Sequence, residues 1–163
     1  MKLNLGCGTD IRSGYVNCDT LALDGVDKVF DLNHLPYPFD DNSADEVCMK
    51  HVLEHLNTDL PKIMEELHRI LKPGGRLLIK VPYYNSRGAW VDPTHRRCFA
   101  FDTFMYFVKG HWSNFYSRRH FSSGRVKGNP SKFGKLIPHA GLRKQLSVIF
   151  GHLIIELEIE LIK

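Results

Sequence analysis

Several features are scarce or missing in this sequence of 163 residues. It has only four cysteines, Cys7, Cys18, Cys48 and Cys98, and no two of them stand in a Cys-x-x-Cys spacing. No stretch approaches the roughly 20 apolar residues that a membrane-spanning helix needs, and no basic, apolar leader precedes the first β-like run. These absences exclude a disulfide scaffold and favour free thiols in the cytoplasm. The length predicts a single domain over residues 1–163.

Acidic residues are missing between positions 103 and 155, a stretch that holds nine lysine or arginine residues. Acids return only at the end of the chain, where Glu156, Glu158 and Glu160 alternate with apolar residues. The block 109–144 is therefore basic and also carries aromatic side chains. Such a block indicates an anionic partner or acceptor, although a solvated basic face is the commoner explanation. Nucleic-acid binding stays open as an alternative and is not favoured.

A third glycine is also missing near the N-terminus. Residues 3–10 read LNLGCGTD, and no glycine follows Gly6 and Gly8 where a Gly-x-Gly-x-x-Gly pattern needs its third. That third glycine allows close packing of helix on strand beneath a dinucleotide pyrophosphate. Its absence disfavours a nicotinamide-dependent oxidoreductase.

Short β-like runs and helical or turn segments alternate along the first half of the chain. The best helix is predicted over residues 57–75, with Asn57 or Thr58 as its cap and an apolar face that includes Ile63 and Leu67. The β-like runs are 2–5, 14–19, 26–32, 44–49 and 76–82. This alternation predicts an α/β sandwich with a mostly parallel sheet.

The second half of the sequence is harder to interpret. Residues 83–135 are expected to be irregular, with one helix around 101–108, and 140–150 fits either a helix or a sixth strand. The end of the chain alternates, with Leu153, Ile155 and Leu157 on one face and glutamates on the other. This pattern predicts an antiparallel strand near a sheet edge.

Distinctive residues stand where each predicted strand ends. The first run ends in Gly6-Cys7-Gly8, the second at Asp19, the third at Asp31-Leu32 and the fourth near His51. Ligands of open parallel sheets bind beyond the carboxyl ends of the strands. Bare backbone, a carboxylate for a ribose diol and an acid beside an apolar residue for an adenine indicate a nucleoside site there.

The run LNLGCGTD…GYVNCDT…VDKVFDLNHLPYPFDDNSADEV…HVLEHL…LHRILKPGGRLLIKVP resembles the class I S-adenosylmethionine-dependent methyltransferases, in particular the small type-11-like group. The resemblance covers about residues 3–82. It implies a Rossmann-like three-layer α/β sandwich with an antiparallel C-terminal strand. It departs from the family pattern at Asn4, where an acid is usual, at Asp10, where a third glycine is usual, and at residues 9–14, which are too short for the usual first helix.

The resemblance also implies roles for the strand-end residues. Asn4, Gly6, Cys7 and Gly8 would bind the methionine part of S-adenosylmethionine, Asp19 the ribose, and Asp31 with Leu32 the adenine. His51 would line the floor beneath the sulfonium. The product would be S-adenosylhomocysteine, and the acceptor a small molecule, a sugar or a lipid-linked intermediate.

Two further segments suggest catalytic or metal chemistry. His51 to His55 read HVLEH, which matches a zinc-protease signature, but no third ligand is evident and no metal is predicted. In the segment 90–101, Asp92 and His95 could orient or deprotonate an acceptor, and Arg96 and Arg97 could hold an anion. The alternative is that Asp92 caps a turn and His95 bonds to backbone.

These observations lead to one hypothesis and its competitors. The chain is expected to be a methyltransferase whose base is His95, or else His51, with residues 83–135 forming an acceptor segment or lid. An RNA methyltransferase or RNA-binding module using residues 109–144 is the main alternative, and a zinc hydrolase is a weaker one. A homodimer is compatible with the sequence.

Overall fold

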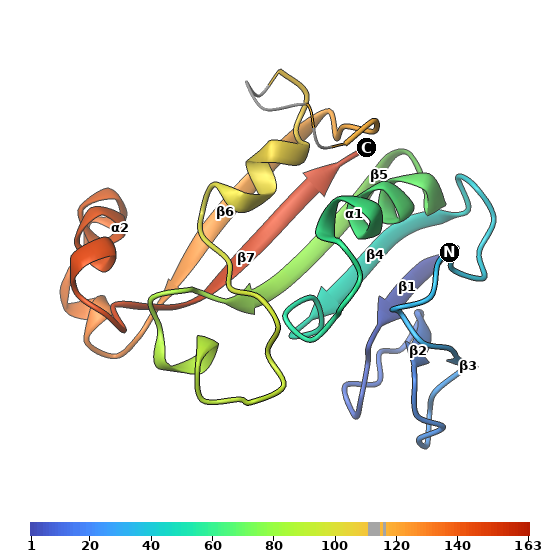
Figure 1. Ribbon diagram of the computed structural model, residues 1–163, viewed down its shortest axis with the longest axis horizontal. Helices are drawn as coiled ribbons and strands as arrows, with labels where there is room; N and C mark the ends of the chain where they lie inside the picture. Colours follow the sequence, from blue (N-terminus) through green and yellow to red (C-terminus); the bar gives the residue numbers. More distant parts are fainter. Residues whose placement is uncertain (111–114, 116) are drawn as a thin grey trace.

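The computed structural model describes residues 1–110, 115 and 117–163, and its centre is one seven-stranded sheet in the order β3-β2-β1-β4-β5-β7-β6. The strands β3, β2, β1, β4 and β5 run parallel, whereas β7 lies antiparallel to both β5 and β6 (Figure 1). The predicted α/β class with a mostly parallel sheet and an antiparallel C-terminal strand is confirmed.

The helices and strands occupy well-defined ranges. The strands are β1 (Lys2–Leu5), β2 (Val16–Asp19), β3 (Lys28–Val29), β4 (Ala44–Lys50), β5 (Leu71–Pro82), β6 (Ser123–Pro130) and β7 (Ile154–Ile162). The α-helices are α1 (Leu60–Ile70) and α2 (Ala140–Ile149), and the 3-10 helices are η1 (Arg87–Ala89), η2 (Thr103–Phe107) and η3 (Gly134–Leu136).

Helix α1 packs on one face of the central strands and forms the core with them (Figure 1). Its buried apolar side chains recur every three or four residues, as an amphipathic helix requires. They are Ile63, Met64, Leu67 and Ile70. The helix is shorter than predicted, because its N-cap is Asp59 rather than Asn57 or Thr58 and it ends before Leu71.

The opposite face of the sheet is polar. Alternate residues of a strand point to opposite faces, so the strands that bury Val47, Leu77 and Leu157 toward α1 present charged side chains on the other side. In the described residues between β1 and β2 there is no helix, as the short segment 9–14 led us to expect. The uncovered side chains include Lys80, Arg125, Lys127, Glu158 and Glu160.

Strand β6 was missed, because residues 83–135 were expected to be irregular. Its inward positions alternate Gly124, Val126 and Gly128, whereas its outward positions carry Arg125 and Lys127. A Cβ added at Gly124 would lie 2.7 Å from Leu161 Cδ2, and one at Gly128 would lie 2.6 Å from Phe101 Cζ. Glycines at these inward positions permit close packing on the core. Because they are not large apolar residues, the sequence lacks the apolar alternation that usually indicates a strand.

The structure also gives the outcome of three other expectations for the second half of the chain. Residues 140–149 form a helix, α2, and the helix around 101–108 is the shorter 3-10 helix η2. The C-terminal strand β7 is the second strand from the sheet edge, because β6 lies outside it. At the start of β7 the alternation of buried and exposed side chains also differs from the prediction, because Ile154 is buried and Ile155 is exposed. This part of the strand lies next to a register shift at Asn129 and Pro130.

Candidate functional site

A cavity of about 300 Å³ lies where β1, β2, β3 and β4 end at the carboxyl edge of the sheet. Its volume is at the lower end of the range for small-molecule sites. The lining residues are Gly6, Asp19, Thr20, Asp31, Leu32, Asn33, His51, Val52, His55 and Leu56. Five residues singled out in the sequence therefore come together here: Gly6, Asp19, Asp31, Leu32 and His51. We call this the strand-end cavity.

Gly6 forms the turn directly after β1. Its φ angle is +67°, in the region that favours glycine, and an added Cβ would lie 2.4 Å from Val52 Cγ2. Because Val52 also lines the cavity, any side chain at position 6 would displace that wall. The turn thus needs glycine for its backbone conformation and for the space beside it.

Asp19 ends β2, and two backbone N–H groups fix its carboxylate. The amide of Gly8 donates to Oδ2 at 2.8 Å, and the amide of Leu21 donates to Oδ1 at 3.1 Å. An ionised carboxylate accepts about four hydrogen bonds, so about two acceptor positions remain. The side chain is therefore rigidly placed and still able to accept from a ligand.

Asp31 and Leu32 follow β3 and form another part of the wall. The Asp31 Oδ1 atom accepts from the Asn33 backbone N–H at 2.8 Å and from Asn33 Nδ2 at 3.1 Å. The backbone N–H of Asn33 is the main reason that the pKa of Asp31 lies below its usual value, with a side-chain bond and His34 adding to it. An ionised acceptor therefore stands beside a buried leucine, which is the combination that an adenine amino group and ring would need.

His51 is the first residue after β4, and its backbone is strained. Its φ angle is +54°, although it is not a glycine; such strain often marks functional positions. The ring lies between two carboxylates, with Nδ1 3.3 Å from Glu54 Oε1 and Nε2 2.9 Å from Glu156 Oε2. The hydrogen bond to Glu54 raises the pKa of His51 most, against the effect of burial, and Glu156 raises it further.

Asn4, Cys7 and Gly8 lie close to the cavity without lining it. The Asn4 side chain donates to Asp10 O at 2.7 Å and to Asn17 Oδ1 at 3.0 Å, so it holds the loop that follows β1. Cys7 is buried, and burial is the main cause that raises the pKa of its thiol. Gly8 acts through its bond to the Asp19 carboxylate.

The segment around Asp92 and His95 takes the turn and backbone roles that were left open. The Asp92 Oδ1 atom accepts from Thr94 N at 2.8 Å and from Thr94 Oγ1 at 2.6 Å. His95 Nδ1 lies 3.1 Å from Ala89 O. Neither Asp92 nor His95 lines the cavity, but the His95 ring packs edge to face on the ring of His55, which does, with centroids 4.7 Å apart.

Arg97 is already engaged, although it was considered as an anion ligand. Its Nη2 donates to the backbone oxygens of Leu56 and Thr58, each at 2.7 Å. Burial lowers the pKa of this guanidinium. Arg97 therefore ties the segment after β5 to the loop after β4.

The HVLEH segment does not form the helix that a zinc-protease site would need. Residues 51–57 are turns and loop, so His51 and His55 do not share one helical face. Instead, His95 approaches Glu54 and His55 from a segment 40 residues further along the chain. The sequence analysis found no third group of this kind, because the approach depends on how the segment after β5 folds back.

Sequence reasoning also missed part of the cavity wall. Thr20, Asn33, Val52 and Leu56 line it. Asn33 in addition accepts from the backbone N–H of Asn57 at 2.7 Å and so links the loop after β3 to the loop after β4. Each of these residues is within five positions of one that the strand ends did indicate, and that proximity is the signal that could have found them.

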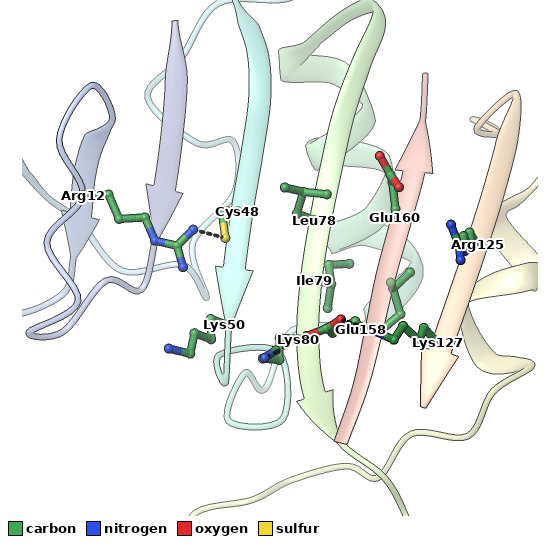
Figure 2. Close-up of a pocket in the computed structure, with 11 residues that line it drawn as sticks. Arg12, Cys48, Lys50, Leu78, Ile79, Lys80, Arg125, Lys127, Glu158 and Glu160 are labelled. Carbon is green, nitrogen blue, oxygen red and sulfur yellow. Dashed lines mark hydrogen bonds and ion pairs between the residues drawn. The ribbon is translucent and has the colours of Figure 1, made fainter. Parts of the chain in front are cut away.

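A larger hollow, of about 510 Å³, lies on the polar face of the sheet (Figure 2). We call it the sheet-face groove. Several of its polar groups already have partners: Lys80 Nζ is 3.0 Å from Glu158 Oε1, and Arg12 Nη1 donates to Cys48 Sγ at 2.7 Å. It contains none of the strand-end residues. We therefore place the candidate site in the strand-end cavity despite its smaller volume.

Two cations of the basic block 109–144, Arg125 and Lys127, line the sheet-face groove. In the register of β6 with β7, Arg125 lies opposite Glu160 and Lys127 opposite Glu158. Lys127 Nζ is 3.7 Å from Glu158 Oε2. The acid-free stretch thus faces the acidic end of the chain across neighbouring strands, which is a favourable cross-strand arrangement and reduces the charge available to an anionic partner. Residues 111–114 and 116 of the block lie outside the described residues.

Comparison with known proteins finds similarity to methyltransferases. Residues 3–79 match the family model of a methyltransferase domain. A 2-phytyl-1,4-naphtoquinone methyltransferase of Nostoc punctiforme is 44% identical over 45 residues, which are 28% of this chain and 19% of that protein. A ubiquinone/menaquinone biosynthesis C-methyltransferase of Pseudoalteromonas translucida is 36% identical over 69 residues, 42% of this chain and 27% of that protein. The matches thus span about a fifth and about a quarter of these relatives.

The fold agrees over the whole chain. A crystal structure of a SAM-dependent methyltransferase from Archaeoglobus fulgidus superimposes with a TM-score of 0.70 and 16% identity, covering 99% of this chain and 85% of the other. At that identity the likeness is one of fold. The sheet order and the position of the cavity at its carboxyl edge agree with a Rossmann-like α/β fold. Residues 3–79, just under half of the chain, are in addition similar to a methyltransferase domain.

None of the helices in the described part of the chain has the length and apolar character needed to cross a membrane.

Proposed function

We propose that this protein binds S-adenosylmethionine in the strand-end cavity and transfers its methyl group to a small-molecule acceptor. The observation that carries the proposal is the meeting of a glycine turn, two ionisable carboxylates and a buried leucine at one cavity. Their order along the strands is the order in which the family binds the methionine, ribose and adenine parts of the cofactor.

Each residue of the cavity has a definite task in this proposal. The Asp19 carboxylate, held by Gly8, accepts from the ribose hydroxyls with its unused lone pairs. Asp31 and Leu32 contact the adenine, and the backbone around Gly6 approaches the methionine part. His51, between Glu54 and Glu156, lies on the wall beneath the reacting centre.

Positioning provides most of the catalysis. When bound, S-adenosylmethionine supplies a methyl group already activated by a sulfonium. Gly6, Asp19, Asp31 and Leu32 would hold the cofactor so that its methyl group faces an acceptor lone pair, and S-adenosylhomocysteine would be the product. Holding the two partners in line can suffice for this step.

Where the acceptor must also lose a proton, His51 lines the cavity and His95 does not. Because both ring nitrogens of His51 face carboxylates, His51 would relay that proton to Glu54 or Glu156.

The acceptor is proposed to be a small molecule, in keeping with the quinone-type compounds in the names of the two relatives. An RNA acceptor is not favoured, because the cations of β6 face the glutamates of β7. The segment 83–102 packs against the wall of the cavity through His95 and His55, and we propose that the acceptor binds between this segment and the cavity.

Calorimetric titration with S-adenosylmethionine, S-adenosylhomocysteine and NAD tests the cofactor directly. We expect the first two to bind and NAD not to bind. Asp19→Ala should weaken both by about 30-fold or more, because two charge-assisted hydrogen bonds are lost. Asp24→Ala, which removes an exposed acid from the next loop, is the matched control and should bind as the wild type does.

Formation of S-adenosylhomocysteine from a panel of reduced quinones and phenols then tests the transfer. Cofactor binding without turnover on any member of the panel would contradict this acceptor class. Equal affinity in the wild type and Asp19→Ala would contradict the site.

A further inference from the structure

We propose that Glu54, His55 and His95 form a binding site for a divalent transition-metal ion of the zinc type. One possible ligand atom from each of the three residues lies within 4.8 Å of the others. Two imidazoles and one carboxylate are a ligand set typical of zinc sites that keep an open coordination position. The proposal does not depend on the methyl-transfer activity.

The hydrogen bonding of His95 leaves one ring nitrogen available. Its Nδ1 lies 3.1 Å from the backbone oxygen of Ala89. A carbonyl oxygen can only accept, so Nδ1 must carry the proton. The Nε2 atom of His95 lies 4.0 Å from Asp92 Oδ2, which is beyond hydrogen-bond distance. In the neutral ring Nε2 then has a free lone pair, as a metal ligand needs.

The protonated nitrogen of His55 can be assigned in the same way, from its contact with Thr94 and the contact of Thr94 with Asp92. His55 Nδ1 is 2.9 Å from Thr94 Oγ1, and that hydroxyl is 2.6 Å from Asp92 Oδ1. The hydroxyl has a single proton, and the carboxylate can only accept it. Thr94 must therefore accept from His55 Nδ1–H, which leaves His55 Nε2 unprotonated. Asp92 and Thr94 act as positioning residues for this ring, as outer partners of metal-bound histidines do.

Glu54 provides the third and independent observation. Its side chain is 1% exposed, and Oε1 contacts His51 Nδ1 at 3.3 Å. The other oxygen, Oε2, is buried and has no hydrogen-bond partner among the residues that the structure describes. A buried carboxylate oxygen without a partner is costly, and a bound cation would satisfy it.

The distances indicate how the site would close. Ligand atoms around one tetrahedral zinc ion with bonds of about 2.0 Å lie about 3.3 Å apart, which is shorter than the 4.8 Å limit found here. Small rotations of the three side chains would bring them to that spacing. Because His55 lines the strand-end cavity, the ion would lie beside the cavity, with a position left for water or for an acceptor atom.

Titration of chelator-treated protein with Zn²⁺, without S-adenosylmethionine, tests the proposal by calorimetry. We expect one equivalent to bind. Glu54→Gln should weaken Zn²⁺ binding by more than about 100-fold, and Thr94→Val by about 10- to 100-fold, because the second variant removes only the partner that orients His55. His152→Asn is the matched control: it removes an exposed histidine elsewhere, and asparagine tolerates the left-handed backbone at that position, where φ is +63°.

Thermal unfolding separates binding from folding defects. Zn²⁺ should raise the melting temperature of the wild type and of His152→Asn, since it binds only the folded state, but not that of Glu54→Gln. In chelator, Glu54→Gln should still unfold cooperatively, because glutamine keeps the shape of the side chain and removes only the charge that faces His51. An equal Zn²⁺ affinity in wild type and Glu54→Gln, or the lack of an equimolar site in a folded wild type, would overturn the proposal.

Discussion

The strand-end cavity and the sheet-face groove differ in size and in how their polar groups are used. The groove is larger, about 510 Å³ against about 300 Å³. In the groove, Lys80 and Lys127 both lie within ion-pair distance of Glu158. In the cavity, Asp19 is fixed by two backbone amides and keeps acceptor positions free. The groove is a charged sheet surface on which several cations are paired with acids, whereas the cavity keeps hydrogen-bonding capacity for a ligand.

Rigidly placed polar groups with unused hydrogen-bonding capacity therefore indicate a binding site better than cavity volume does. Parallel strands that end together bring acceptors from separate parts of the sequence to one edge. Antiparallel strands such as β6 and β7 instead place opposite charges face to face in register. The predictions that follow run from the largest expected effect to the smallest, and all but the one for His68 compare variants in the two regions.

Gly6→Ala should abolish measurable S-adenosylmethionine binding, a loss of more than about 100-fold. The new methyl group would strain a left-handed backbone and displace Val52 from the cavity wall. It should also lower the free energy of unfolding by about 1–3 kcal/mol. Calorimetry and urea unfolding measure the two effects.

Gly14→Ala is the matched control for that variant. Gly14 also has a positive φ, +79°, but an added Cβ would meet nothing within 4 Å. We expect a similar cost in backbone strain and unchanged cofactor binding. If both variants lose binding equally, strain in the loops, and not the shape of the cavity, controls the site.

A second prediction concerns a polar group that is buried without a partner outside either hollow. His68 on α1 packs on Phe121, and its Nδ1 has no partner among the described residues. Burial, with Lys163 and Arg119 nearby, lowers the pKa of His68 to about 4. The unfolded chain takes up this proton near pH 6.5, so His68 should reduce stability as the pH falls from about 6.5 to about 4. Above that window its contribution is constant.

Because His68 is partly exposed, we expect this loss to be about 2 kcal/mol at most. Urea unfolding of the wild type and of His68→Gln at pH 7.5 and pH 4.5 measures it. Between pH 7.5 and pH 4.5 the free energy of unfolding should fall more in the wild type than in His68→Gln. An equal decline in both would assign the acid sensitivity to the carboxylates instead.

Asp31→Asn should weaken S-adenosylmethionine binding by about tenfold, less than the changes at Gly6 or Asp19. One charge-assisted acceptor for the adenine becomes a neutral one, while Leu32 still packs on the ring. Glu160→Gln makes the same chemical change in the sheet-face groove and should leave the affinity unaltered. Loss of affinity in Glu160→Gln would mean that the groove, and not the cavity, binds the cofactor.

The sequence predicted the first half of the fold well because local and global signals agree there. The runs that became β1, β2 and β4 are apolar, buried and ended by turn-forming residues, and the face of α1 has helical spacing. In β6 the inward positions are Gly124, Val126 and Gly128, so the strand carries almost no apolar signal. Its burial comes from the aromatic and aliphatic side chains that pack over those glycines, which only the folded chain shows.

The same contrast applies to the site. Asp19 and Asp31 could be singled out because each stands at or just after the end of a strand. The topology of a parallel sheet then brings these strand ends to one edge. The contact of His95 with His55 could not be predicted, because it depends on the path of an irregular segment 40 residues away. Asn4 was assigned to the cofactor from the family pattern, but its amide bonds Asp10 and Asn17, a use that side-chain type alone does not reveal.

The smallest expected effect is in the sheet-face groove. Lys127 is 62% exposed and its ion pair with Glu158 is 3.7 Å long, so Lys127→Ala should lower the free energy of unfolding by about 0.5 kcal/mol or less. A double-mutant cycle with Glu158→Ala, measured by urea unfolding at low and high salt, gives the coupling between the two charges. The coupling should shrink as salt screens it, and cofactor affinity should stay constant in all four proteins. A large coupling that resists salt would show that these charges are buried in the native protein, so that something covers this face in solution. The contrast between a solvated groove of paired charges and an available cavity would then have to be given up.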